Sequence, residues 1–338
     1  VLGDLGLIPE AALYHGNYSK WLKLANSVKL RLAMRICYVK PDLAKQYAME
    51  AVRDGVMETA DDSALFQSWG SITIINPLEK IWNGYSDTRM GASMDSYLNG
   101  YNDPRLPVYF QPVTEGDNKG EYRGVANGMP NPQQEDYKAM SAPNVQEKST
   151  DSPLRWMMAS EVAFLRAEGA MRGWTAEMGG TAEEFYNKGI ELSFLENGLS
   201  ADAAARYAAD ETSKPTDFTD VSAANTKYNI SALGKITIKW NAGASEEEQL
   251  ERIITQKWIA MFPNGTEAWS EFRRTGYPLI FPVRSNYPTS GVDTNKQIRR
   301  MVFPQSEYSN NGAAVQEAVK LLGGPDNGGT KLWWDKKN

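Results

Sequence analysis

The sequence has 338 residues, of which 41% are hydrophobic and 23% are charged, and its formal net charge is −6. This composition is typical of a globular protein, and the acidic balance argues against a nucleic-acid groove lined with lysine and arginine. Because Cys37 and His15 are the only residues of their types, a disulfide within the chain is excluded, and any histidine zinc site or Ser-His-Asp triad would depend on one imidazole.

Residues 17–55 predict two helices joined by a short turn. Asn17 or Ser19 can cap the first helix, which runs to about Val39. Pro41 suits the first turn of the second helix, and the short connection predicts that the two helices lie antiparallel. The apolar residues that recur at helical spacing in the first helix are Trp21, Leu24, Val28, Leu32 and Ile36.

Residues 61–150 are rich in Gly, Pro, Asn, Asp and aromatic residues, and we predict only a short helix there, at 90–100. Connections of this length in a compact protein are usually functional or disordered. Their aromatic content argues against disorder. We therefore expect residues 61–150 to form a loop-rich ligand face.

Residues 155–198 and 245–275 repeat the helix–turn–helix pattern of residues 17–55. Thr181 and Glu184 form a capping box at the start of one helix, which is a strong sign of a helix N-terminus. Such pairs bury faces that no pair can cover alone. We predict a mainly α fold, in which tetratricopeptide-like pairs form a scaffold with long irregular insertions and minor β structure.

The remaining stretches predict little regular structure. Residues 235–240, with the sequence KITIKW, give the best strand prediction. Residues 276–338 are predicted to be a C-terminal loop region with one helix near 312–322. We treat residues 1–338 as a single domain.

Three stretches also resemble one known family. They are YHGNYSKWLKLANSVKLRLAMRI at 14–36, ERIITQKWIAMFPNGTEAWSEFRRTGYP at 251–278, and RRMVFPQSEYSNN with LWWDKK at 299–337. These stretches are similar to the SusD/RagB family, specifically to its SusD-like, starch-binding-associated outer-membrane lipoproteins. The resemblance implies a mostly helical fold and non-catalytic binding of an oligosaccharide or polysaccharide. It also implies delivery of that glycan to a SusC-like TonB-dependent outer-membrane transporter.

The resemblance further implies a location on the extracellular face of the cell outer membrane. Family members begin with a lipid-bearing cysteine and a further helical segment. Neither precedes residues 14–36 in this sequence. We therefore expect an N-terminally incomplete chain whose lipid anchor is an N-terminal cysteine absent from the sequence.

The expected glycan site lies on residues 61–150. Sugar rings offer C–H faces that indole and phenol rings cover, and hydroxyl groups that Asn, Asp and Arg can pair. No cofactor or metal ion is predicted, since aspartate-rich turns such as Asp61–Asp62 are more often solvated than bound to calcium. The candidate site residues are Trp69, Trp82, Tyr85, Arg89, Tyr101, Asp103, Arg105, Tyr109 and Tyr122.

Two other functions stay open at this point. A helical glycoside hydrolase combines an aromatic groove with two carboxylates, and 42 Asp and Glu residues supply many possible pairs. A tetratricopeptide-type interaction scaffold would instead bind a peptide in a concave helical groove. Glycan turnover would favour the hydrolase, and a protein partner without glycan binding would favour the scaffold.

Overall fold

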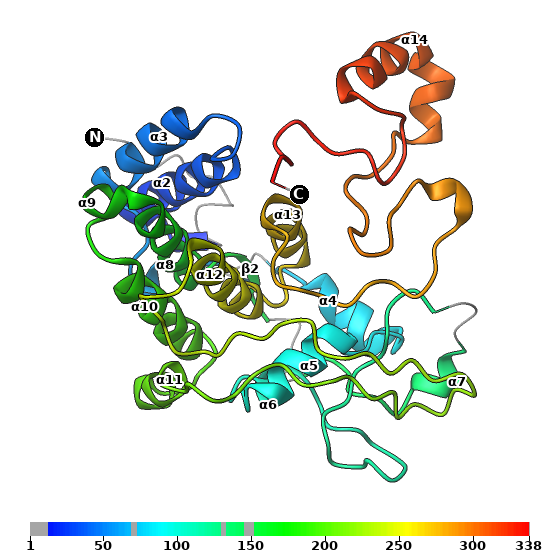
Figure 1. Ribbon diagram of the computed structural model, residues 1–338. Coiled ribbons are helices and arrows are strands. Elements are labelled where there is room, and N and C mark those ends of the chain that lie inside the picture. The colour runs from blue at the N-terminus through cyan, green and yellow to red at the C-terminus, as the bar shows by residue number, and fades with distance from the viewer. Residues whose placement is uncertain (1–12, 69–72, 130–132, 145–151, 338) are drawn as a thin grey trace.

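The computed structural model describes residues 13–68, 73–129, 133–144 and 152–337, and helices dominate it (Figure 1). Within these ranges no helix combines the length and the apolar character needed to cross a bilayer. In chain order the elements are α2 (Tyr18–Arg35), α3 (Pro41–Arg53), β1 (Ala64–Phe66), α4 (Pro77–Glu79), α5 (Ala92–Gly100), α6 (Leu106–Tyr109), α7 (Gln134–Tyr137), β2 (Leu154–Met157), α8 (Ala159–Gly169), α9 (Thr175–Met178), α10 (Ala182–Leu195), α11 (Ala201–Ala208), α12 (Glu246–Ala260), α13 (Gly265–Thr275) and α14 (Gln305–Leu322).

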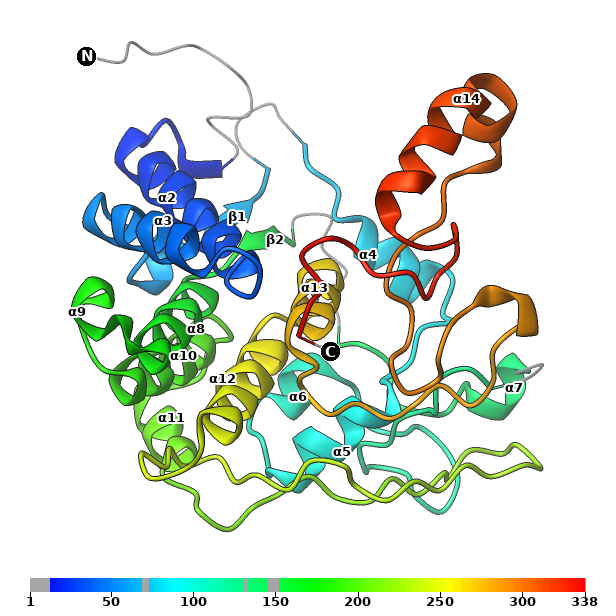
Figure 2. The same ribbon diagram turned by 45° about the horizontal axis from the view of Figure 1, so that its top comes forward.

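The first predicted helix pair is confirmed as α2 and α3, which pack side by side (Figure 2). The Asn17 side chain accepts a hydrogen bond from the backbone N–H of Lys20, as expected of an N-cap. The apolar spacing of α2 does not bury every member of the series, because the Leu32 side chain is 60% exposed. Ser27 lies on the buried face instead, where its hydroxyl donates to the Lys23 carbonyl and accepts from the N–H of Met57. A satisfied polar residue thus occupies a position that apolar periodicity cannot identify.

Helix α8 lies at the centre of the scaffold and is buried almost all round. Val162 and Leu165 join an apolar cluster with α2 and α3, whereas Phe164 joins a second cluster with α10 and α12. Helix α10 approaches α8 closely at Gly189, where an added Cβ would lie 2.7 Å from the Phe164 ring. The capping box of Thr181 and Glu184 at the start of α10 is confirmed.

The β structure differs from the sequence prediction in two places. Residues 154–157 form strand β2 rather than the start of a helix, and β2 pairs antiparallel with β1. Residues 235–240 are not a strand. The carbonyl groups of Ile236 and Ile238 instead accept hydrogen bonds from the hydroxyls of Tyr101 and Tyr186. Buried tyrosines therefore replace the neighbouring strand that this segment would need. Helix α14 begins at Gln305, earlier than expected.

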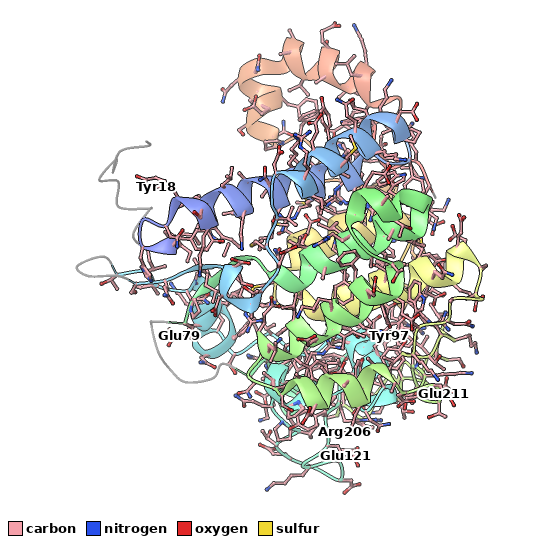
Figure 3. All side chains as sticks on the ribbon, turned by 90° about the vertical axis from the view of Figure 1, so that its left-hand side faces the viewer. Tyr18, Glu79, Tyr97, Glu121, Arg206 and Glu211 are labelled. Atoms are coloured by element: carbon pink, nitrogen blue, oxygen red, sulfur yellow. The ribbon has the colours of Figure 1, made fainter. Side chains whose placement is uncertain are left out.

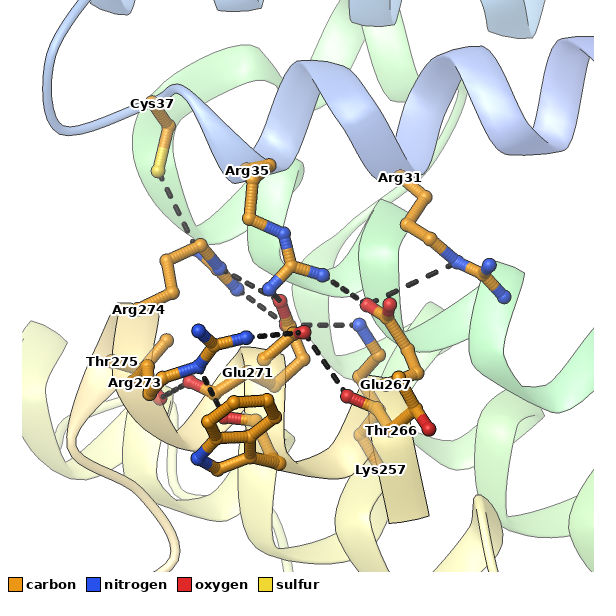
Figure 4. Close-up of polar contacts among 12 residues, drawn as sticks. Arg31, Arg35, Cys37, Lys257, Thr266, Glu267, Glu271, Arg273, Arg274 and Thr275 are labelled. Carbon is orange, nitrogen blue, oxygen red and sulfur yellow. Dashed lines mark hydrogen bonds and ion pairs between the residues drawn. The ribbon is translucent and has the colours of Figure 1, made fainter. Parts of the chain in front are cut away.

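A buried group of charged side chains joins α2, α8, α12 and α13 (Figure 4). Arg274 lies 2.6 Å from a carboxylate oxygen of Glu168 and 2.6 Å from one of Glu271. Lys257 and Arg35 also contact Glu271, at 2.9 and 3.2 Å. Helices α2 and α8 and the consecutive helices α12 and α13 are therefore held in one arrangement by paired charges.

Candidate functional site

A cleft of about 810 Å³ opens where β2, α4 and the turn between α12 and α13 come together. Glu79 of α4 lies on its wall. In Figure 3, Glu79 marks the cleft side of the molecule, and Arg206 of α11 and Glu211 lie at a different edge. The lining residues are Asn76, Leu78, Glu79, Trp82, Val108, Tyr109, Asn144, Ser152, Pro153, Leu154, Arg155, Trp156, Glu196, Asn197, Gly198, Leu199, Phe262, Pro263 and Asn264.

Two indole rings line this cleft, and each is supported by a phenylalanine. Trp156 is 48% exposed, and its ring stacks on Phe66 with centroids 5.0 Å apart and planes 19° apart. Trp82 is partly exposed and stacks on Phe262, with centroids 5.9 Å apart and planes 12° apart. A ring backed in this way is held in position and keeps surface for a second ring-shaped partner.

The backbone before Trp82 has an unusual local structure. Asn76 caps α4 by accepting from the N–H of Leu78 at 3.0 Å, and the helix then continues as a π-helical turn, Lys80–Gly84. The N–H of Tyr85 closes this turn on the Lys80 carbonyl at 3.0 Å. Wide turns of this kind occur frequently at functional sites. Here the turn carries Trp82, which lines the cleft.

Amide and guanidinium groups surround the rings, and several keep hydrogen-bonding capacity. The amide nitrogen of Asn144 donates to the Pro107 carbonyl at 3.0 Å and keeps one N–H, whereas that of Asn197 donates to both the Ser193 carbonyl and the Tyr109 hydroxyl, at 2.6 and 3.3 Å. Arg155 donates from one terminal nitrogen to the Glu196 carbonyl at 3.4 Å. An amide has two donors and two acceptor positions, and a guanidinium has five donors. The cleft can therefore pair with several hydroxyl groups.

Glu196 is the most constrained carboxylate in the cleft. It accepts from the Ser63 hydroxyl at 2.9 Å, from the Ser160 N–H at 3.0 Å and from the Ser160 hydroxyl at 2.5 Å. Burial raises the pKa of Glu196, and these hydrogen bonds oppose that rise. The carboxylate fastens the end of α10 to the start of α8, which is a structural task.

The sequence matches, over residues 8–335, the family described as "Susd and RagB outer membrane lipoprotein". The chain belongs to the SusD-like family. Among solved structures, this SusD-like chain is 43% identical to a chitin-binding SusD homolog from Flavobacterium johnsoniae, with a TM-score of 0.88, covering 97% of this chain and 66% of that one. No curated protein matches it.

Two structures from Bacteroides thetaiotaomicron show the same likeness. A SusD homolog is 39% identical with a TM-score of 0.90, covering 100% of this chain and 70% of that one. A SusD-like protein is 44% identical with a TM-score of 0.87, covering 96% and 66%. The chain therefore spans about two thirds of the length of these relatives, and the mainly helical fold expected from the sequence is confirmed.

The structure brings only some of the predicted site residues of this SusD-like chain to the cleft. Trp82 and Tyr109 line it, and the Tyr109 ring centroid lies 4.8 Å from that of Phe262. Tyr85 is 57% exposed and points its ring toward the Lys80 ammonium group rather than lining the cleft. Trp69 lies outside the described residues.

Tyr101, Asp103 and Arg105 lie in the interior. Arg105 is fully buried and lies 2.7 Å from the Asp103 carboxylate. The Tyr101 hydroxyl donates to a backbone carbonyl at 3.2 Å. A glycan on the surface cannot reach these three side chains, whose polar groups are already paired with the protein. Tyr122 is partly buried and packs against the apolar cluster that contains Tyr101.

Sequence reasoning missed Trp156, since the predicted helix begins at residue 155 and includes it. Its place on a short strand opposite Phe66 depends on pairing with a segment about ninety positions earlier, which no local pattern reveals. Phe262 lies in the 251–278 stretch that carries the family resemblance, but its stack on Trp82 is likewise a long-range contact.

A second concavity, of about 700 Å³, lies between α10 and α11. Its walls carry alanines of α11 and the acidic side chains Glu183 and Glu191. The one aromatic residue that lines it, Trp240, is 8% exposed. This concavity therefore lacks the accessible rings that distinguish the cleft. Within the described ranges, no cluster of three or more His, Cys, Asp or Glu side chains is placed to hold a metal ion.

Proposed function

We propose that this SusD-like chain binds an oligosaccharide or polysaccharide in the cleft between Trp82 and Trp156, without cleaving it. The observation that carries the proposal is the pair of supported, partly exposed indoles in one cleft, with amide and guanidinium groups around them. The glycan would be held by ring stacking and hydroxyl pairing. The family description supports an outer-membrane lipoprotein at the cell surface.

The chemistry of the cleft favours binding over hydrolysis. Hydrolysis requires one carboxyl group to protonate the leaving oxygen and a second to act as base or nucleophile. Both oxygens of Glu196 are used by serine donors, so this carboxylate is poorly placed for proton transfer to a ligand. We expect chitin- and cello-oligosaccharides to be recovered intact after incubation with the protein. Shorter products that disappear in Glu79→Gln or Glu196→Gln would instead establish a hydrolase.

We predict that Trp156→Ala weakens glycan affinity about tenfold or more, because exposed tryptophans at the centre of a binding site carry a large share of the binding energy. Trp82→Ala should have an effect of similar size. Isothermal titration with hexasaccharides of the chitin, cellulose, starch and xylan series measures it, and the chitin-binding relative makes the chitin series the first choice.

Trp333→Ala is the matched control for this experiment. Trp333 is 64% exposed and lies near the C-terminus, outside the cleft lining. Its substitution should leave glycan affinity unchanged. Unchanged affinity in both Trp82→Ala and Trp156→Ala, with the helical circular dichroism spectrum preserved, would place the glycan elsewhere.

We propose further that a SusC-like TonB-dependent transporter receives the bound glycan. Membership of the SusD-like family supports this partner. Affinity purification of the protein from its native outer membrane should recover a large β-barrel protein. Recovery of soluble partners alone, together with no response to any glycan, would support the interaction-scaffold alternative.

A further inference from the structure

A smaller cavity of about 310 Å³ adjoins the glycan cleft. Leu78, Trp82, Phe262 and Pro263 line both spaces. The stacked pair of Trp82 and Phe262 therefore stands between the cleft and this cavity. Helix α5 contributes Ser93 and Met94 to the wall of this cavity. The shared side chains make the cavity and the cleft direct neighbours.

The cavity differs from the cleft in the chemistry of its walls. Beyond the shared Trp82 and Phe262, three further rings and two thioethers line it, together with one branched aliphatic side chain. Aromatic rings favour a partner ring in offset or edge-to-face contact, and methionine sulfur contacts ring edges favourably. These side chains are Phe110, Trp258, Phe281, Met90, Met94 and Ile280.

Two of the polar side chains that line the cavity, Arg89 and Ser93, are already paired with backbone atoms, and the Asn127 amide also lies on its wall. Each guanidinium nitrogen of Arg89 donates to a carbonyl group, with distances of 2.7 Å to Lys138 and 2.8 Å to Thr88 among them. The Ser93 hydroxyl oxygen accepts from the N–H of Phe281 at 2.9 Å. A hydroxyl-bearing sugar placed here would give up hydrogen bonds to water with few replacements.

We infer that this cavity, which we call the aryl subsite, receives an aromatic substituent attached to the glycan that occupies the cleft. The inference rests on the proposed function of the cleft. The five rings select a flat aromatic group over a sugar ring, since a sugar needs partners for its hydroxyls. The volume accommodates one substituted benzene ring. The substrate class is therefore a glycan that carries an aryl ester or aryl ether.

The test compares methyl and 4-nitrophenyl β-glycosides of N,N′-diacetylchitobiose by isothermal titration. Burying one aromatic ring is expected to make the 4-nitrophenyl glycoside bind about tenfold more tightly than the methyl glycoside. Met94→Trp should fill the aryl subsite and reduce this ratio to about one. Met301→Trp makes the same change on a side chain that is 71% exposed, and it should keep the wild-type ratio.

A second variant guards against misfolding of Met94→Trp. Gly91 lines the same cavity, has a negative φ of −78°, and offers an added Cβ only ordinary contact with Asn127 at 3.8 Å. Gly91→Leu should therefore fold and also reduce the ratio. Equal affinities of the two glycosides in the wild-type protein would overturn the aryl subsite and leave glycan binding standing.

The same measurements separate failure of the aryl subsite from failure of the proposed function. If neither the methyl glycoside nor any hexasaccharide binds, but free 4-nitrophenol gives ligand-observed NMR signals that Met94→Trp suppresses, glycan binding in the cleft falls and the cavity is an aromatic site independent of a glycan. An n-hexyl glycoside that binds as tightly as the 4-nitrophenyl glycoside would overturn the preference for aromatic groups. Absence of binding by every probe would overturn both.

Discussion

Replacing Arg274 by methionine is expected to lower the free energy of unfolding by about 3–5 kcal/mol, because removal of one partner leaves buried charges uncompensated. Arg274 is fully buried and pairs with both Glu168 and Glu271, whose side chains are 1% and 2% exposed. Methionine fills much of the volume but donates no hydrogen bond. Urea denaturation followed by circular dichroism at pH 7 measures the loss.

Arg53→Met is the matched control, since Arg53 pairs with Asp54 on the surface with a side chain that is 67% exposed. Exposed pairs contribute little, so this variant should unfold almost like the wild-type protein. A loss in Arg274→Met no larger than in Arg53→Met would contradict the view that the buried charges hold the four helices together.

Acid provides an independent test of the same cluster. Burial raises the pKa of Glu168, but the attraction of Arg274 and Arg172 outweighs it and lowers the value to about 2. A carboxyl group with a depressed pKa in the folded state contributes stability above its unfolded pKa, near 4.5, and loses it as the pH falls toward 2. Arg274→Met removes the main cause of the depression. Its acid unfolding midpoint should therefore move to higher pH.

The charged cluster also affects the cleft. Lys257 belongs to α12 and Glu271 belongs to α13, and the turn between these helices supplies Phe262, Pro263 and Asn264 to the cleft wall. The ion pair of Lys257 and Glu271 therefore joins the two helices on either side of this turn. Arg274 shares Glu271 with Lys257, so an Arg274→Met variant that remains folded should bind the proposed glycan less tightly in isothermal titration.

Helix ends were predictable from the sequence where a cap marks them. Thr181, Asn17 and Ser245 each accept a hydrogen bond from the backbone three positions later, and the helices begin as expected. The start of α8 was not predictable, because this helix is buried on nearly every side and buries Ser160, Glu161 and Glu168 together with its apolar residues. Without a distinct solvent-exposed face, periodicity cannot separate strand β2 from the helix that follows.

The residues that line the cleft were only partly predictable. Ring-rich loops pointed to Trp82 and Tyr109, and both line the cleft. The same reasoning selected Arg105 and Asp103, because sequence shows the residue type and not the burial. In the interior of the fold, Arg105 donates to Gln256, and the Tyr207 hydroxyl donates to Asp103. Tyr207 and Gln256 also contact each other, although 49 positions separate them. Contacts of that range are decided by packing and not by local pattern.

Glu251 on α12 occupies an environment that is costly for a charge. Its side chain belongs to a residue that is only 8% exposed, and burial raises its pKa to about 7 although Arg252 opposes the rise. Among the described residues, one carboxylate oxygen of Glu251 and two guanidinium nitrogens of Arg252 have no hydrogen-bond partner. Neighbouring buried charges that do not meet in a hydrogen bond weaken the fold.

Glu251→Gln is therefore expected to stabilise the protein at pH 8 by up to about 3 kcal/mol, since each pKa unit corresponds to about 1.4 kcal/mol. A carboxyl group whose pKa is raised in the folded state favours folding while protonated, and the native protein loses stability as the pH rises from about 4.5 to about 7. Glutamine copies the protonated form, so the variant and the wild-type protein should be equally stable near pH 4 and diverge above it. Glu246→Gln, at an exposed position in the first turn of the same helix, should leave the pH profile unchanged. Urea denaturation curves of the three proteins at pH 4 and pH 8 measure these differences. A Glu251→Gln variant that is destabilised at both pH values would show that the carboxylate has a partner that stabilises its charge.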